Sequence, residues 1–113
     1  MKENVKQYIL ILEDDEDLSE GICLSLQSPE LTFVRSRTVA QAKQLLKERK
    51  YDLLILDINL PDGNGFDFYR EAKERRPYTA IIFLTSNDME NDMFKGYELG
   101  TEDYVTKPFT PLE

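Results

Sequence analysis

Residues 53–65 of the chain read L-L-I-L-D-I-N-L-P-D-G-N-G. Residues 53–56 are apolar without polar alternation, a pattern typical of a strand covered on both faces, as in a parallel sheet. Asp57 follows directly, and residues 59–65 are rich in turn-forming types. This stretch predicts a buried strand that ends in a carboxylate and is followed by a tight turn.

The rest of the chain alternates between strand and helix patterns. Four more segments predict strands, the last two more weakly: 8–12, 80–84, 31–34 and 104–106. Apolar residues recur at helical spacing in four other segments: 18–26, 39–46, 66–72 and 89–97. This order predicts an α/β domain, a doubly wound five-stranded parallel sheet with helices on both faces.

Two helix starts carry capping signals. Thr38 with Gln41 and Asp17 with Glu20 have the capping-box spacing, in which a side chain before the helix accepts a hydrogen bond from the first turn. These pairs predict where the first two helices begin.

The composition excludes several classes of function. The 113 residues suit one domain, and 22 acidic against 14 basic residues give a net charge of −8, which disfavours nucleic-acid binding. The chain has no histidine, which removes the usual general base and zinc ligand. The single cysteine, Cys23, predicts a buried free thiol, and no apolar run has the length of a signal peptide or membrane span. We therefore expect a soluble cytoplasmic protein with no membrane or nucleic-acid partner of its own.

Carboxylates gather where strands of the predicted sheet end. Glu13 and Asp14 follow the first strand, and Asp57 follows the third. Like charges at adjacent strand ends repel one another unless protons or a cation neutralise them. Oxygen ligands without histidine or cysteine favour Mg²⁺, Mn²⁺ or Ca²⁺. For residues 15–17 we expect the simpler role of acidic residues at the positive end of a helix.

Two more polar residues end the later strands. Thr85 closes the fourth strand, and Lys107 follows the fifth. Either alone suits a turn or a solvated surface, but the first, third, fourth and fifth strands are neighbours in the expected sheet. A carboxylate, a cation site, a hydroxyl and an ammonium at one rim predict a phosphoryl-transfer site.

Four stretches, in order, resemble the response-regulator receiver family of two-component signalling. They are I-L-I-L-E-D-D, L-L-I-L-D-I-N-L-P-D-G-N-G-F, I-I-F-L-T-S and G-T-E-D-Y-V-T-K-P-F. The resemblance runs from about Gln7 to the end and is greatest to receivers attached to winged-helix DNA-binding output domains. It implies a flavodoxin-like fold with strand order 2-1-3-4-5.

The resemblance also implies a phosphoryl site. Asp57 looks like the phosphoacceptor and a ligand of Mg²⁺, for which Mn²⁺ could substitute. Asp14 resembles the acid that binds the metal directly, and Glu13 the acid that binds it through water. The backbone carbonyl of Asn59 resembles the remaining protein ligand.

A second set of residues resembles the family's switch. Thr85 would contact the phosphoryl group, Lys107 would pair with it, and Tyr104 would move between outward and inward positions. Asn59 and Asn87 flank the path of an attacking water, so we expect them to tune the lifetime of the phosphoryl group.

The resemblance implies partners as well. Because the chain has no histidine, the phosphoryl group would come from a phosphohistidine on a sensor histidine kinase. The surface of the fourth helix and fifth strand would then control an output, DNA binding and transcription, with a homodimer as one option. The domain would be a phosphoacceptor with self-phosphorylation and autodephosphorylation chemistry, not an enzyme.

The end of the sequence differs from the family pattern. Relatives continue past K-P-F-x-P-x-E into a fifth helix, whereas this sequence stops at Glu113. We expect residues 1–113 to be a receiver domain cut before or within that helix, without its output domain. Strand side chains including Ile9, Ile11 and Val105 would then face water, which favours low stability or association.

Three alternatives stay open. A phosphatase of the aspartate-nucleophile class also uses aspartate and Mg²⁺, but it places a second acid two residues after the nucleophile, where this chain has Asn59. A flavodoxin-like cofactor module would need a hydroxyl- and glycine-rich loop after the first strand. A receiver that acts only as a phosphate-independent docking module would not need the full set of site residues.

Overall fold

The secondary structure follows the predicted alternation. The computed structural model describes residues 6–85 and 103–106, with side chains described for residues 6–84. The helices are α1 (Glu16–Leu26), α2 (Val39–Glu48) and α3 (Gly65–Arg75). The strands are β1 (Gln7–Leu12), β2 (Leu31–Ser36), β3 (Leu53–Asp57), β4 (Asn59–Leu60), β5 (Gly63–Asn64), β6 (Ala80–Thr85) and β7 (Asp103–Thr106). The helix predicted at 89–97 lies outside the described residues.

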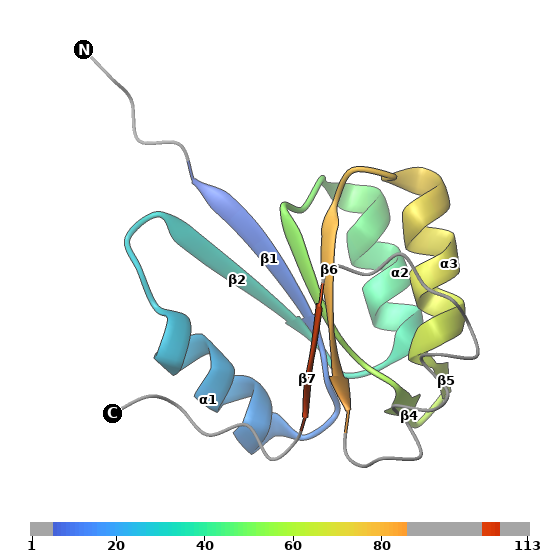
Figure 1. Cartoon of the computed structure of the whole chain (residues 1–113), viewed down its shortest axis with the longest axis horizontal. Coiled ribbons are helices and arrows are strands. Elements are labelled where there is room, and N and C mark those ends of the chain that lie inside the picture. The colour runs from blue at the N-terminus through green and yellow to red at the C-terminus, as the bar shows by residue number, and fades with distance from the viewer. Residues whose placement is uncertain (1–5, 86–102, 107–113) are drawn as a thin grey trace.

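Five of these strands form one parallel sheet in the order β2-β1-β3-β6-β7 (Figure 1). Because β6 and β7 are the fourth and fifth long strands along the chain, the predicted order 2-1-3-4-5 is confirmed. The winding reverses between β1 and β3, and in open α/β sheets ligands bind beyond the carboxyl ends of the strands at such a point. β4 and β5 form a separate antiparallel hairpin directly after β3.

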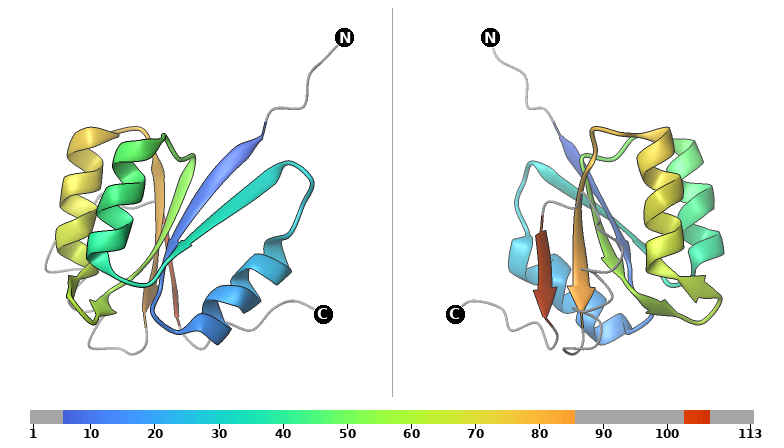
Figure 2. Two further views of the ribbon diagram at one scale, coloured as in Figure 1. Left: turned by 180° about the vertical axis from the view of Figure 1, so that it is seen from behind. Right: turned by 45° about the vertical axis from the view of Figure 1, so that its right-hand side comes forward.

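Helices cover both faces of the sheet, α1 on one side and α2 with α3 on the other (Figure 2). Successive strand residues point to opposite faces. Leu10 and Leu12 of β1 therefore pack in the core under α2 and α3, whereas Ile9 and Ile11 pack in the core under α1. This two-sided burial is the reason that the strand sequences are apolar without alternation.

The expected exposure of Ile9 and Ile11 is wrong. Ile9 is 4% exposed and Ile11 is fully buried. Both pack in a cluster with Ile22 of α1 and with Ile55 and Leu84 of the neighbouring strands. Contacts with α1 and with the adjacent strands are therefore enough to bury these two side chains. The side chain of Val105 lies outside the described residues.

The helix starts confirm one capping prediction and correct the other. The Thr38 side chain accepts a hydrogen bond from the Gln41 backbone N–H at 3.1 Å and caps α2 as predicted. For α1 the cap is Asp15, which accepts from the Leu18 N–H at 3.1 Å, so the predicted cap at Asp17 is two residues too late. Asp17 lies in the first turn, where its charge favours the positive end of the helix.

Two smaller features bear on the composition arguments. Cys23 is a free thiol that packs partly buried against the core under α1, and this burial raises the pKa of the thiol. Among the described residues, no helix combines the length and apolar character needed to cross a membrane.

Candidate metal and phosphoryl site

The site lies where β1 and β3 end side by side. Leu12 and Leu56 are paired across these two parallel strands. The residues that follow them, Glu13 and Asp57, are therefore brought to the same edge of the sheet although they are far apart in sequence. Asp14 comes next on the β1 side.

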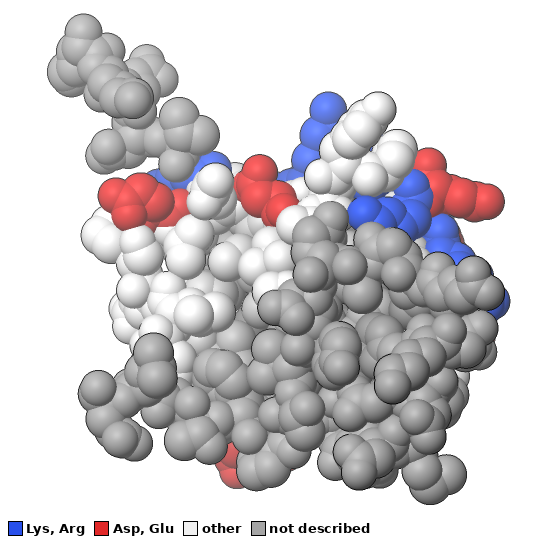
Figure 3. Space-filling model, viewed as in Figure 1, with Lys and Arg blue, Asp and Glu red and all other residues white. Residues whose placement is uncertain are grey.

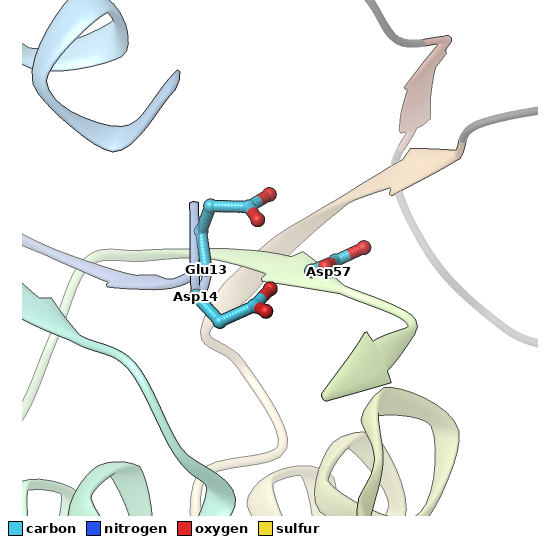
Figure 4. Close-up of side chains that lie close together, drawn as sticks. All are labelled: Glu13, Asp14 and Asp57. Carbon is cyan, nitrogen blue, oxygen red and sulfur yellow. The ribbon is translucent and has the colours of Figure 1, made fainter. Parts of the chain in front are cut away.

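Three carboxylates converge at this edge. Glu13, Asp14 and Asp57 each offer an oxygen atom, and these atoms all lie within 4.8 Å of one another. The side chains of Glu13 and Asp14 extend from β1 toward Asp57 (Figure 4). Glu13 is 1% exposed and Asp57 is 4% exposed, whereas Asp14 is partly exposed. The rim therefore combines two buried acids with one that solvent reaches.

The spacing of these oxygens fits a divalent cation. Two unit charges between 4 and 5 Å apart repel by roughly 3 to 4 kcal/mol at an effective dielectric constant of 20, so three ionised carboxylates here are costly without a counter-charge. In octahedral Mg²⁺ coordination the ligand oxygens lie about 2.1 Å from the metal, so opposite ligands are about 4.2 Å apart. The separations between the three oxygens are therefore close to those of oxygens bound to a single ion. A ligand set made only of oxygens suits Mg²⁺, Mn²⁺ or Ca²⁺.

Backbone groups orient the two buried acids. The Ile58 N–H donates to Asp57 Oδ1 at 2.7 Å, and the Asp15 N–H donates to Glu13 Oε2 at 3.0 Å. The Glu13 N–H donates to the Ser36 carbonyl at 3.0 Å, which ties the end of β1 to the end of β2. The carboxylates are therefore held by the main chain of their own loops.

The turn after Asp57 is tightly packed against the main chain of that residue. The Gly65 N–H donates to the Ile58 carbonyl at 2.7 Å. A Cβ atom on Gly65 would collide with the backbone carbonyl oxygen of Asp57. Asn59 is exposed and pairs with Asn64 across the hairpin that connects Ile58 to Gly65. Asn59 therefore lies beside the acidic cluster on a loop with little room to shift.

The other predicted site residues are only partly placed. Thr85 ends β6 and directly follows Leu84, the partner of Asp57 across the sheet, so its backbone lies at the same rim. The backbone of Tyr104 lies in β7, opposite Phe83. Their side chains, together with all of Lys107 and Asn87, lie outside the described part of the structure. The structure thus brings the three acids together, whereas the grouping of these four side chains with them remains a prediction.

Sequence reasoning missed Asp62, at the tip of the hairpin. Its two carboxylate oxygens accept hydrogen bonds from the Val39 N–H at 2.7 Å and the Ala40 N–H at 3.0 Å, at the start of α2. These bonds lower the pKa of Asp62, so the carboxylate is charged at neutral pH. The only signal in the sequence was a polar residue in a turn, and nothing local indicated a partner 23 residues away.

Known proteins have sequences similar to this chain. Regulatory protein VanR from Enterococcus faecium is 35% identical over 93% of this chain and 45% of its own length. The phosphate regulon transcriptional regulatory protein PhoB from Pseudomonas aeruginosa is 34% identical over 96% of this chain and 48% of its own. The chain therefore spans about half the length of these curated relatives.

A solved structure is also similar to this chain and is also about twice as long. DrrB, described as a Thermotoga maritima OmpR/PhoB homologue, superposes with a TM-score of 0.79 at 33% identity, over 95% of this chain and 48% of that one. Residues 9–113 match the family described as the response regulator receiver domain. With the sheet order, the acidic cluster and this match in agreement, the chain belongs to the response-regulator receiver-domain family.

Proposed function

We propose that this domain accepts a phosphoryl group on Asp57 in a Mg²⁺-dependent reaction. The observation that carries the proposal is the convergence of Glu13, Asp14 and Asp57, with oxygen atoms within 4.8 Å, at the carboxyl ends of β1 and β3. Such a cluster is unfavourable on its own and suits a bound cation next to an incoming dianion. Receiver-family membership supports the same reading.

The chemistry is a transfer between two covalently bound states. An Asp57 carboxylate oxygen attacks the phosphorus of a phosphohistidine on a sensor kinase, and the new O–P bond forms as the N–P bond breaks. The electron pair of that bond returns to the imidazole nitrogen, which takes up a proton.

The residues of the cluster would hold the metal in different ways. Asp14 and Asp57 would bind it directly, Glu13 through water, and Asn59 through its backbone carbonyl. When bound, the cation offsets the roughly two negative charges that the phosphoryl group adds beside existing carboxylates. The protein's own contribution is to hold these oxygens in place before the donor arrives.

A phosphodonor assay tests the proposal. Acetyl phosphate with Mg²⁺ is expected to add one phosphoryl mass to the intact protein, and excess chelator is expected to prevent it. A protein that gains no mass with Mg²⁺, or gains it equally in chelator, would contradict the proposal.

The neighbouring acids Asp14 and Asp15 should behave differently. Asp14→Ala removes a metal ligand and is expected to weaken Mg²⁺ binding and labelling by roughly tenfold or more. Asp15→Ala removes the α1 cap, which costs about 1 kcal/mol of folding stability, but it keeps the backbone N–H that orients Glu13. Calorimetric Mg²⁺ titrations and thermal melts of both variants check this. Equal losses of Mg²⁺ affinity would mean that the metal-binding residue is assigned wrongly.

Thr85 and Lys107 are proposed to contact the phosphoryl group once it is bound to Asp57. Thr85→Ala and Lys107→Ala are therefore expected to label detectably but to lose most of the spectral change at Tyr104 on phosphorylation or beryllofluoride addition. Tyrosine fluorescence of the labelled protein measures that change. A full response in both variants would separate the site from the proposed switch.

The remaining roles concern lifetime and partners. Asn59 and Asn87 would set the rate of dephosphorylation, measurable as the hydrolysis half-life of phosphorylated variants. Since the curated relatives are about twice as long, we propose a cytoplasmic signalling protein in which this domain controls a DNA-binding output. A sensor histidine kinase would be the donor, and a homodimer would be one form of the active state.

A further inference from the structure

The tip of the β4–β5 hairpin is hydrogen-bonded to the start of α2. Asp62 occupies the two-residue turn between the strands and accepts from the N–H groups of Val39 and Ala40. Behind the tip, a Cβ atom on Gly63 would lie 3.1 Å from a Val39 methyl group, so the hairpin backbone packs closely on α2. Two hydrogen bonds and this close packing therefore join the loop to a helix that lies outside the acidic cluster.

The same hairpin is tied at its base to the phosphoacceptor. Asn59 and Asn64 are paired across it, and the Gly65 N–H donates to the carbonyl of Ile58, next to Asp57. The Asn64 side chain accepts from the Phe66 N–H at 2.7 Å and caps α3. The hairpin thus spans the distance between α2 and the residue that would carry the phosphoryl group, with Asn59 in its first strand.

We infer that Asp62 is a positioning residue for the phosphorylation reaction, which fixes the hairpin so that the Asn59 carbonyl faces the metal. This inference rests on the proposed function. In this role Asp62 would contact neither the metal nor the phosphoryl group, because it is not one of the three clustered acids. It acts by anchoring the loop to the α2 backbone.

The inference depends on two physical properties: the strength of the hydrogen bonds that Asp62 accepts, and the narrow range of coordination geometries that Mg²⁺ tolerates. Hydrogen bonds from backbone N–H groups to a carboxylate are about twice as strong as neutral ones, and the positive end of α2 adds to the attraction. Mg²⁺ demands near-ideal octahedral geometry, so a loop that shifts its carbonyl loses affinity. Without Asp62, the hairpin would keep its packing on Val39 and the contacts at its base but would lose both hydrogen bonds to the α2 backbone.

The α2 start offers a matched control. Thr38 caps the same helix by accepting from the Gln41 N–H in the first turn, whereas Asp62 reaches α2 from the hairpin. Asp62→Ala and Thr38→Ala each remove α2 caps and are both expected to lower the melting temperature. Only Asp62→Ala is expected to weaken Mg²⁺ binding, by roughly tenfold, with a matching loss of the labelling rate at subsaturating Mg²⁺ that saturating Mg²⁺ restores.

Two further variants separate position from charge. Asp62→Asn keeps one acceptor oxygen and is expected to fall between the parent and Asp62→Ala. Asp67→Asn removes another exposed acidic charge, on α3, where Asp67 pairs with Arg70 at 3.5 Å, and is expected to bind Mg²⁺ like the parent.

The outcomes are read from calorimetric Mg²⁺ titrations of the folded variants. If Asp62→Ala binds Mg²⁺ as Thr38→Ala does, or if Asp67→Asn loses as much affinity, the positioning role is overturned while the proposed function stands. If the unmodified protein itself binds no Mg²⁺, both inferences are overturned together.

Discussion

Asp57→Ala is expected to take up no phosphoryl group under conditions in which the unmodified protein gains one phosphoryl mass. Asp57 alone among the acids of the cluster closes a buried strand of the sheet while its carboxylate faces the other two. Intact mass after incubation with acetyl phosphate and Mg²⁺ measures the effect. A labelled Asp57→Ala protein would show that another side chain is the acceptor.

The variant Asp57→Asn distinguishes loss of the acceptor from loss of the fold. Replacing one of three close carboxylates by a neutral amide of the same shape removes repulsion, so this variant is expected to melt higher than the parent without Mg²⁺. Mg²⁺ stabilises the parent by binding its folded state, and this increment is expected to shrink in Asp57→Asn. A melting temperature below that of the parent would mean that Asp57 stabilises the metal-free fold.

Gly65→Ala is expected to destabilise the protein by on the order of 2–4 kcal/mol, the range of severe backbone clashes. The added Cβ would meet the carbonyl oxygen of Asp57 and the Cα atom of Ile58, which are main-chain atoms and cannot rotate away. The phosphoacceptor or the start of α3 must therefore move. Denaturant unfolding gives the stability, and labelling under Mg²⁺ gives the effect on the site.

Gly21→Ala in α1 is the matched control. Apart from the helix's own nearby backbone, no atom lies within 4 Å of a Cβ built there. In a helix interior, alanine is more stable than glycine by roughly 0.5–1 kcal/mol of folding free energy. This substitution is expected to raise stability and leave labelling unchanged. If Gly65→Ala were as well tolerated as Gly21→Ala, the loop around Asp57 would have more room than the packing indicates.

Most of the fold was predictable because the signals are local. Apolar runs such as residues 53–56 need two covered faces wherever they lie, and Thr38 caps the helix that follows it. The order of strands and helices limits the sheet to a few topologies. Local signals are less precise at a helix end that offers several acids. For this reason the sequence predicted Asp17 as the cap of α1, whereas the structure has Asp15 there.

The composition and order of residues by themselves determined an α/β domain with acidic residues at strand ends and no histidine chemistry. Only the tertiary structure decided that Glu13 and Asp57 come within 4.8 Å of each other, because the register of β1 with β3 sets that distance. It also decided that Ile9 and Ile11 are covered and that Asp62 binds the start of α2. These contacts join residues far apart in the chain, and their geometry depends on how whole strands and helices pack, which no local pattern of residues specifies.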